Sequence, residues 1–172
     1  NNDSSNGILV LATEMHVSDL QIFQNVTKPM VLVSSYFKQQ PYNFVTMDNE
    51  VGIYTATEYL IQKGHRDIML IGSSVFSNNY FYRRKGFYMA LMDYGLDIRG
   101  KDLSINPTLK GAYQDFSAYL KDKAHHIPTA FVASNDHMAI SAIRALQKNG
   151  YQVPDDISVT GFDDIAFCQI SS

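Results

Sequence analysis

The chain has 172 residues, of which 45% are hydrophobic and 18% are charged, and its formal net charge at pH 7 is −3. This composition is typical of a folded globular protein, and the slightly acidic balance excludes a broad electrostatic surface for nucleic acid. The single cysteine, Cys168, excludes an internal disulfide and a zinc site made of several thiolates. No apolar run approaches the length of a membrane span, so we expect a soluble, cytoplasmic protein.

In chain order, the apolar periodicity predicts a strand at 8–13, a helix at 17–26, strands at 30–33 and 43–47, a helix at 48–64, a strand at 67–72, a helix at 79–95, a strand near 103–106, a helix near 111–124, a strand at 129–133, a helix at 135–150 and a strand at 157–161. Because apolar strands alternate with helices, we expect an α/β fold with a parallel sheet and helices on both of its faces. The first strand starts almost at the N-terminus and no closing element follows the last, so we expect a fragment of a longer protein.

Polar residues stand where most of the predicted strands end. They are Thr13, Glu14, Ser34, Ser35, Asp48, Asn49, Ser73, Ser74, Asn135, Asp136, Asp163 and Asp164. Ligands of open parallel sheets bind at the carboxyl ends of the strands, so these side chains predict a polar binding site at one edge of the sheet. Helix capping is the alternative at Asp48 or Asn49 and at Asn135 or Asp136, because these residues lie at the starts of predicted helices.

Arg83 stands out among the cations of "YRRKGF" (82–87) because it shares a helix face with Tyr80, Phe87 and Leu91. We therefore expect its guanidinium to be drawn toward the edge of the sheet. A planar group with five N–H donors matches paired acceptors such as sugar hydroxyls or a carboxylate.

Catalytic motifs are absent from the sequence. It contains no G-x-S-x-G elbow and no glycine-rich phosphate loop, and its five histidines lack the spacing of a zinc site. His137 follows Asp136, but adjacent helical residues diverge by about 100°, so neither side chain would orient the other as a catalytic pair. We expect no enzymatic activity, no cofactor and no bound metal.

Four segments together resemble the LacI/GalR family of repressors. They are "NGILVLAT" (6–13), "VTMDNEVGIYTATEYLIQKGHRDIMLIGSS" (45–74), "RRKGF" (83–87) and "PTAFVASNDHMAISAIRALQKNGYQVPDDISVTGFDD" (128–164). They occur in the order found in the effector-binding core of these proteins, and the resemblance covers nearly the whole chain.

The resemblance implies a two-lobed, periplasmic-binding-protein-like (type I) core with an effector between its lobes. Residues 1–47 would form part of the first lobe, which is incomplete, and residues 48–172 most of the second. In the family a DNA-binding helix-turn-helix precedes such a core. Operator DNA would therefore be bound only through a segment that this chain lacks.

The resemblance also implies which residues bind the effector. Arg83 fills the position of the family's effector-binding arginine, and Asn135 and Asp163 match the asparagine and aspartate that hold the effector. Ser34 and Ser73 complete the expected effector-binding set. Ser34 stands where many members carry an aspartate, so one usual sugar contact of the first lobe is altered. Tyr113 is one option for the aromatic contact that many members supply from the segment near 105–113.

The function implied is that of the ligand-binding and dimerisation core of a transcriptional regulator, a repressor of carbohydrate-use genes whose effector is a sugar or a related small molecule. A solute-binding protein of a sugar ABC transporter, which shares the fold, is the alternative. In either case the expected mechanism is a ligand-induced change between hinge states rather than catalysis.

The helix at 136–149 is apolar on more than one side, and in the family such second-lobe helices form the dimer. We therefore expect a homodimer in which Ile140 is the central contact, with Ile143 and Arg144 beside it. The alternative is that a neighbouring part of the same chain covers this face.

Overall fold

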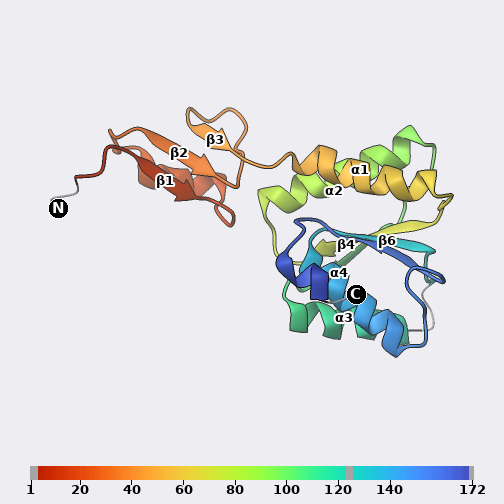
Figure 1. The fold of residues 1–172 in the computed structure, drawn as a ribbon. Helices are drawn as coiled ribbons and strands as arrows, with labels where there is room; N and C mark the ends of the chain where they lie inside the picture. Colours follow the sequence, from red (N-terminus) through yellow and green to blue (C-terminus); the bar gives the residue numbers. More distant parts are fainter. Residues whose placement is uncertain (1–3, 123–125, 171–172) are drawn as a thin grey trace.

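The computed structural model describes residues 4–122 and 126–170. Its elements, in chain order, are β1 (Ile8–Leu11), η1 (Val17–Phe23), β2 (Met30–Val33), β3 (Asn43–Val45), α1 (Asn49–Gln62), β4 (Ile68–Ser73), α2 (Asn78–Asp93), β5 (Asp102–Ile105), α3 (Leu109–Lys121), β6 (Ala130–Ala133), α4 (Asp136–Lys148), β7 (Ser158–Thr160) and η2 (Ala166–Ile170). The predicted α/β alternation is confirmed. The strands form two separate parallel sheets, which an extended segment before α1 connects (Figure 1).

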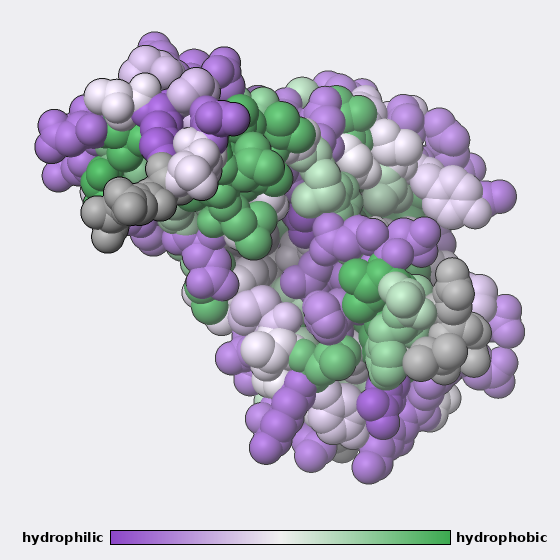
Figure 2. All heavy atoms as spheres, turned by 60° about the vertical axis from the view of Figure 1, so that its left-hand side comes forward, coloured by the Kyte–Doolittle hydropathy of each residue, from purple (hydrophilic) through white to green (hydrophobic). Residues whose placement is uncertain are grey.

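The first sheet has the strand order β1-β2-β3, with Val10 opposite Leu32 and Leu32 opposite Phe44. One of its faces packs on η1 and the following loops through the buried side chains of Ala12, Leu20, Leu32 and Phe37. The other face leaves Leu9, Leu11 and Val45 exposed among the described residues. Figure 2 shows apolar side chains gathered on the surface where this smaller body meets the rest of the molecule.

The segment predicted to be a helix at 17–26 forms a shorter 3₁₀ helix, η1. Only Leu20 of this helix is buried. A short helix depends on the burial of an apolar face for most of its stability, so one buried side chain is too little to support several α-helical turns.

The second sheet has the strand order β5-β4-β6-β7 and is covered on both faces. Helices α1 and α2 pack on one face and α3 and α4 on the other (Figure 1). All four residues of strand β6 are apolar because both of its faces are buried. Ala130 and Val132 pack in the core under α1 and α2, and Phe131 and Ala133 pack in the core under α3 and α4. Both faces of the strand are buried, as parallel sheets require.

Helices α1 and α2 approach each other closely at Gly86. A Cβ atom placed on Gly86 would lie 2.1 Å from the carbonyl oxygen of Glu50, so only glycine fits here. The contact brings Arg83, one turn earlier on α2, beside Asn49, the first residue of α1. The local packing of these two helices therefore sets the position of the Arg83 side chain.

Ile140 on α4 is already covered by its own chain, because its exposed fraction is 4%. The expectation that Ile140 is free to contact a partner is thereby corrected, while Ile143 is half-buried and Arg144 exposed. The carboxylate of Asp136, one turn before Ile140, accepts the backbone N–H of Ile165. The segment after β7 thus reaches the face of α4 on which Ile140 lies.

Within residues 4–122 and 126–170, no helix is both long and apolar enough to cross a membrane.

Gly86→Ala tests the close helix contact. Helix propensity alone would favour alanine by up to about 1 kcal/mol, but the new methyl group meets a backbone carbonyl that cannot rotate away. We expect the clash to win, with a net loss of about 2 kcal/mol in the free energy of unfolding and a fall in Tm of roughly 4–8 °C. Equal stability of Gly86→Ala and the native protein would contradict the packing described.

Candidate ligand-binding site

A cavity of about 340 Å³ lies at the carboxyl ends of the strands, and both sheets contribute to its walls. The lining residues are Thr13, Glu14, Ser34, Met47, Ser73, Val75, Phe76, Ser77, Asn79, Tyr80, Arg83, Pro107, Ser134, Asn135 and Asp163. The structure brings all five residues of the predicted effector-binding set to this one cavity: Ser34 after β2, Ser73 at the end of β4, Arg83 on α2, Asn135 before α4 and Asp163 after β7. Tyr113 lies elsewhere, in a groove beside α3 and α4.

Arg83 is the most deeply buried charge of the cavity, with an exposed fraction of 7%. Its Nε–H donates to Asn49 Oδ1 at 2.7 Å, one Nη1–H donates to the carbonyl oxygen of Ser134, and one Nη2–H donates to Asp163 Oδ1 at 3.0 Å. The guanidinium carbon also lies 3.9 Å from the centre of the Phe162 ring, a cation–π distance. Three donors of Arg83 are therefore satisfied by three separate elements of the second sheet and its helices.

The Arg83–Asp163 pair is held at a cost in solvation. Burial raises the pKa of Asp163 above its ordinary value, although the charge and hydrogen bond of Arg83 oppose the rise. Burial likewise lowers the pKa of Arg83, with Asp163 opposing. For both partners the loss of water outweighs their attraction, which is the usual balance for a buried ion pair.

Two lining residues adopt strained backbone conformations. Ser34 has a φ of 70° and Asp163 a φ of 106°, both in the region that favours glycine. Such conformations cost about 1–3 kcal/mol each and cluster at ligand sites, where the surrounding structure holds them in place. At Asp163 this conformation accompanies the hydrogen bond that its carboxylate accepts from Arg83.

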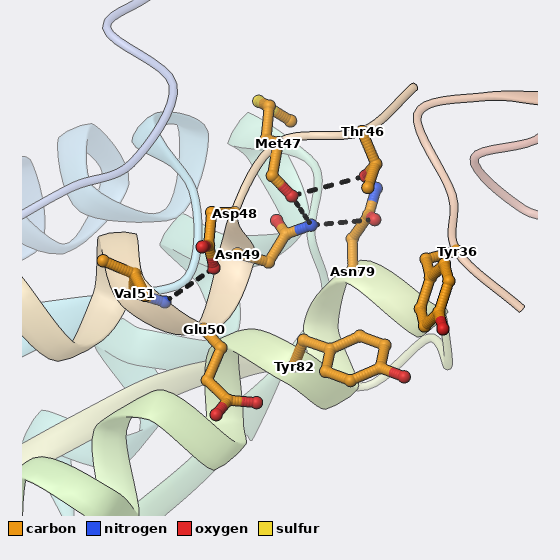
Figure 3. A pocket seen from close by; sticks show the side chains of 9 residues that line it. All are labelled: Tyr36, Thr46, Met47, Asp48, Asn49, Glu50, Val51, Asn79 and Tyr82. Atoms are coloured by element: carbon orange, nitrogen blue, oxygen red, sulfur yellow. Dashed lines mark hydrogen bonds between the residues drawn. The ribbon is translucent and has the colours of Figure 1, made fainter. Parts of the chain in front are cut away.

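A chain of buried amides connects the cavity to the first sheet. Asn49 donates through Nδ2 to Asn79 Oδ1 at 3.1 Å and to the carbonyl oxygen of Met47 at 3.3 Å. Asn79 in turn donates through Nδ2 to the carbonyl oxygen of Ser34 at 2.8 Å. Figure 3 shows Asn49 and Asn79 facing each other beside the segment that crosses between the sheets. Arg83, the crossing segment and the end of β2 thus share one hydrogen-bonded network.

A family model, described as a periplasmic binding protein-like domain, matches residues 57–172. The chain belongs to this family.

Known relatives agree with this assignment. The chain is 34% identical over 161 residues to the HTH-type transcriptional repressor PurR of Glaesserella parasuis, a match that covers 92% of this chain and 46% of that protein. Among solved structures, it superposes on a sugar-binding LacI-family regulator from Escherichia coli in complex with phosphate, with a TM-score of 0.83, 27% identity and coverage of 96% of this chain and 59% of the other. It also superposes on the regulator CelR in complex with cellobiose, with a TM-score of 0.81, 25% identity and coverage of 95% and 50%.

These matches confirm the resemblance to LacI/GalR-family regulators that the motifs predicted, and they do not favour the transporter alternative. The chain spans about half the length of the curated relative it matches.

Asn135 combines a capping role with a place on the cavity wall. Its Oδ1 accepts the backbone N–H of Met138 at 2.9 Å, so it caps α4 as the alternative interpretation predicted. Among the described contacts its Nδ2 donors make no hydrogen bond, which leaves the amide N–H groups available to a ligand. Ser73, by contrast, exchanges hydrogen bonds with the backbone of Val75 at 2.8 and 3.0 Å, so its hydroxyl mainly shapes the loop.

Asn79 and Glu14 are site residues that the sequence analysis did not select. Asn79 lies one helical turn before Arg83 on α2, so the spacing of four residues was a signal that could have identified it. Glu14 was recognised only as one of many polar residues at strand ends. In the structure Glu14 lines the cavity from the side of the first sheet, whereas Arg83 and Asp163 line it from the side of the second sheet.

No histidine in the described ranges is among the residues that line the cavity. His65 bonds to Thr129 Oγ1 at 2.9 Å and to Ser158 Oγ at 3.1 Å, at the opposite end of the second sheet. No group of three His, Cys, Asp or Glu side chains in the part of the chain that the structure describes is arranged to hold a metal ion.

A larger cavity, of about 460 Å³, flanks the crossing segment (Figure 3). Tyr36 and Tyr82, one from each body, line it with ring centres 6.3 Å apart. Its carboxylates already have partners, because Asp48 caps α1 and Glu50 pairs with a lysine. It therefore offers fewer unengaged polar groups than the smaller cavity, which remains the candidate site.

Asp163→Asn tests the electrostatics of the site through pH. Because the pKa of Asp163 is raised in the folded state, protonation of Asp163 stabilises the folded state. This stabilisation is complete at pH values below the ordinary pKa and is lost as the pH rises through the raised pKa. Asparagine stays neutral and keeps that contribution. We therefore expect the stability of Asp163→Asn relative to the native protein to be greater near pH 7 and to decline as the pH is lowered toward about 4, measured by urea unfolding. Asp155→Asn, an exposed charge removal, is the control. A relative stability that rises on acidification would contradict the account.

Proposed function

We propose that this chain is the effector-binding core of a LacI-family transcriptional repressor. Residues 1–47 then belong to the first lobe and residues 48–172 to most of the second. The observation that carries the proposal is the shared cavity, whose polar groups come from both sheets and whose network crosses between them at Asn79 and Ser34. A ligand bound there touches both lobes at once, and this is the geometry that a hinge mechanism needs.

A sugar or a related polar small molecule is the effector that the lining supports best. The wall offers hydroxyl, amide and carboxylate groups for hydrogen bonds, and the rings of Phe76 and Tyr80 for contact with an apolar sugar face. A cavity of about 340 Å³ fits a monosaccharide or a small disaccharide. We assign the effector contacts to Arg83, Asn135 and Asp163, with Ser34 and Ser73 shaping the wall.

The mechanism is allosteric. An effector shifts the equilibrium between two arrangements of the lobes only by its difference in affinity for them. Ligand contacts to Arg83 or Asp163 reach the crossing segment through Asn49, so occupancy of the cavity is coupled to the segment on which the lobes rotate. No catalytic step, cofactor or metal is part of this mechanism.

The partners proposed for the whole protein are operator DNA, bound through a helix-turn-helix outside this chain, and a second copy of the protein in the cytoplasm. For the homodimer we retain α4 as the contact helix. The contact residues proposed on α4 are the exposed Arg144 and the half-buried Ile143, because Ile140 is buried within the chain. A solute-binding protein would share this cavity but would be preceded by a signal peptide, so the residues encoded upstream of Asn1 separate the two functions.

The test of the proposed function is a thermal-shift panel of mono- and disaccharides, nucleobases and sugar phosphates on the full-length protein, followed by operator binding with and without the stabilising compound. An effector should raise Tm and change operator affinity. A compound that raises Tm and leaves operator binding unchanged would contradict the repressor function.

Asn135→Ser separates capping from ligand binding. Serine caps helices about as well as asparagine, but it lacks the amide N–H donors. We expect the Tm of the ligand-free variant to stay close to that of the native protein, whereas its affinity for the stabilising compound should fall about tenfold, the effect of one hydrogen bond to a polar ligand. Asn135→Ala, which loses both roles, should also be destabilised by about 1 kcal/mol. Unchanged affinity in Asn135→Ser would assign Asn135 to capping alone.

A further inference from the structure

The charges that line the cavity do not balance. Glu14 contributes a carboxylate from the first sheet and Asp163 another from the second, whereas Arg83 is the only lysine or arginine among the lining residues. The wall therefore carries two negative charges and one positive charge. Asp136, buried behind Asp163, adds a further negative charge whose field reaches both Asp163 and Arg83.

The positive charge of Arg83 is already committed. Asp163 neutralises it directly, and Asn49 and the Ser134 carbonyl occupy two more donors. An anion that approached Arg83 would have to enter a site with an exposed fraction of 7% and either displace Asp163 or face its charge at close range. Displacement would leave a strained, half-buried carboxylate without its partner.

Nearby cations do not correct the imbalance. Arg84 pairs with Asp102, and Lys85 pairs with Glu50 at 2.7 Å, so a carboxylate outside the cavity neutralises each of these two cations. His137, which also acts on Asp163, is exposed on the first turn of α4 and is screened by water. Glu14 lines the cavity and is exposed, and in the described ranges it forms no ion pair, so no cation of the described chain is paired with it.

We propose that this cavity selects an uncharged polyhydroxylated ligand, a neutral mono- or disaccharide, and rejects the phosphorylated and carboxylated forms of the same sugars. The proposal rests on the proposed function, in that it takes this cavity as the effector site. Carboxylates act only as acceptors, so Glu14 and Asp163 suit the O–H donors of a neutral sugar. A phosphate or uronate brings further acceptors and a like charge, which a partly buried site penalises more than bulk water does.

The first experiment compares charge forms on one ring in the full-length protein. Glucose is measured against glucuronate and glucose 6-phosphate, and galactose against galacturonate and galactose 6-phosphate, by isothermal titration at constant ionic strength. For any ring that binds, the neutral form should bind at least about tenfold more tightly than either anionic form, as expected for a like charge near a partly buried carboxylate. An anionic form that binds as tightly as its neutral partner, or more tightly, overturns the proposal.

The second experiment does not depend on which sugar is recognised. The affinity for inorganic phosphate is measured in the native protein and in Glu14→Gln, Glu14→Lys and Asp155→Asn, the last of which removes one negative charge far from the cavity. Affinity should rise from the native protein to Glu14→Gln and again to Glu14→Lys, by about tenfold in total, and should stay unchanged in Asp155→Asn. No gain in Glu14→Lys, or an equal gain in Asp155→Asn, overturns the proposal.

The two failures are distinguishable. If no sugar of any charge stabilises the protein, the sugar effector of the proposed function is wrong, while the phosphate series still decides whether Glu14 sets the charge preference of the cavity. If a neutral sugar binds but the phosphate series is flat, the function stands and the role of Glu14 is wrong.

Discussion

The burial of one guanidinium organises the site. A charge that is almost removed from water must be matched by acceptors of fixed geometry, and Arg83 finds them in Asn49, the Ser134 carbonyl and Asp163. These partners come from the start of α1, the end of β6 and the turn after β7. The positions of three separate elements are therefore linked through one side chain, and a change at any of them is felt by the other two.

The same side chain is connected by hydrogen bonds to the segment between the two bodies. Asn49 joins Arg83 to the segment that crosses between the sheets, and Asn79 extends the network to the end of β2. Asn49 and Asn79 are buried, so each lost hydrogen bond leaves an unsatisfied polar group and the network favours a small number of defined arrangements. In the proposed mechanism, a ligand that competes for Arg83 or Asp163 biases the crossing segment through this network.

The sequence predicted much of this because the relevant signals are local. Alternating apolar runs identified the strands, and polar residues at their ends identified the edge where Asn135 and Asp163 lie. What it could not predict depends on contacts between distant segments. Ile140 is buried, the chain after β7 bonds to Asp136 on α4, and the salt bridge between Arg83 and Asp163 joins residues 80 positions apart. The sequence could not show that Asn135 both caps α4 and lines the cavity, because an asparagine between a strand end and a helix start is compatible with either role.

The hydrogen-bonded state of the Arg83 side chain tests this account most directly. In a nitrogen-15 NMR spectrum of the ligand-free protein, the Nε–H of Arg83, assigned by its loss in Arg83→Lys, should exchange slowly with water because it is buried and bonded to Asn49 Oδ1. Asn49→Ser, which shortens the acceptor, should speed that exchange. An Nε–H that exchanges with water as fast as those of exposed arginines, or whose exchange does not change in Asn49→Ser, would contradict the claim that a buried Arg83, bonded to Asn49, Ser134 and Asp163, holds the site together.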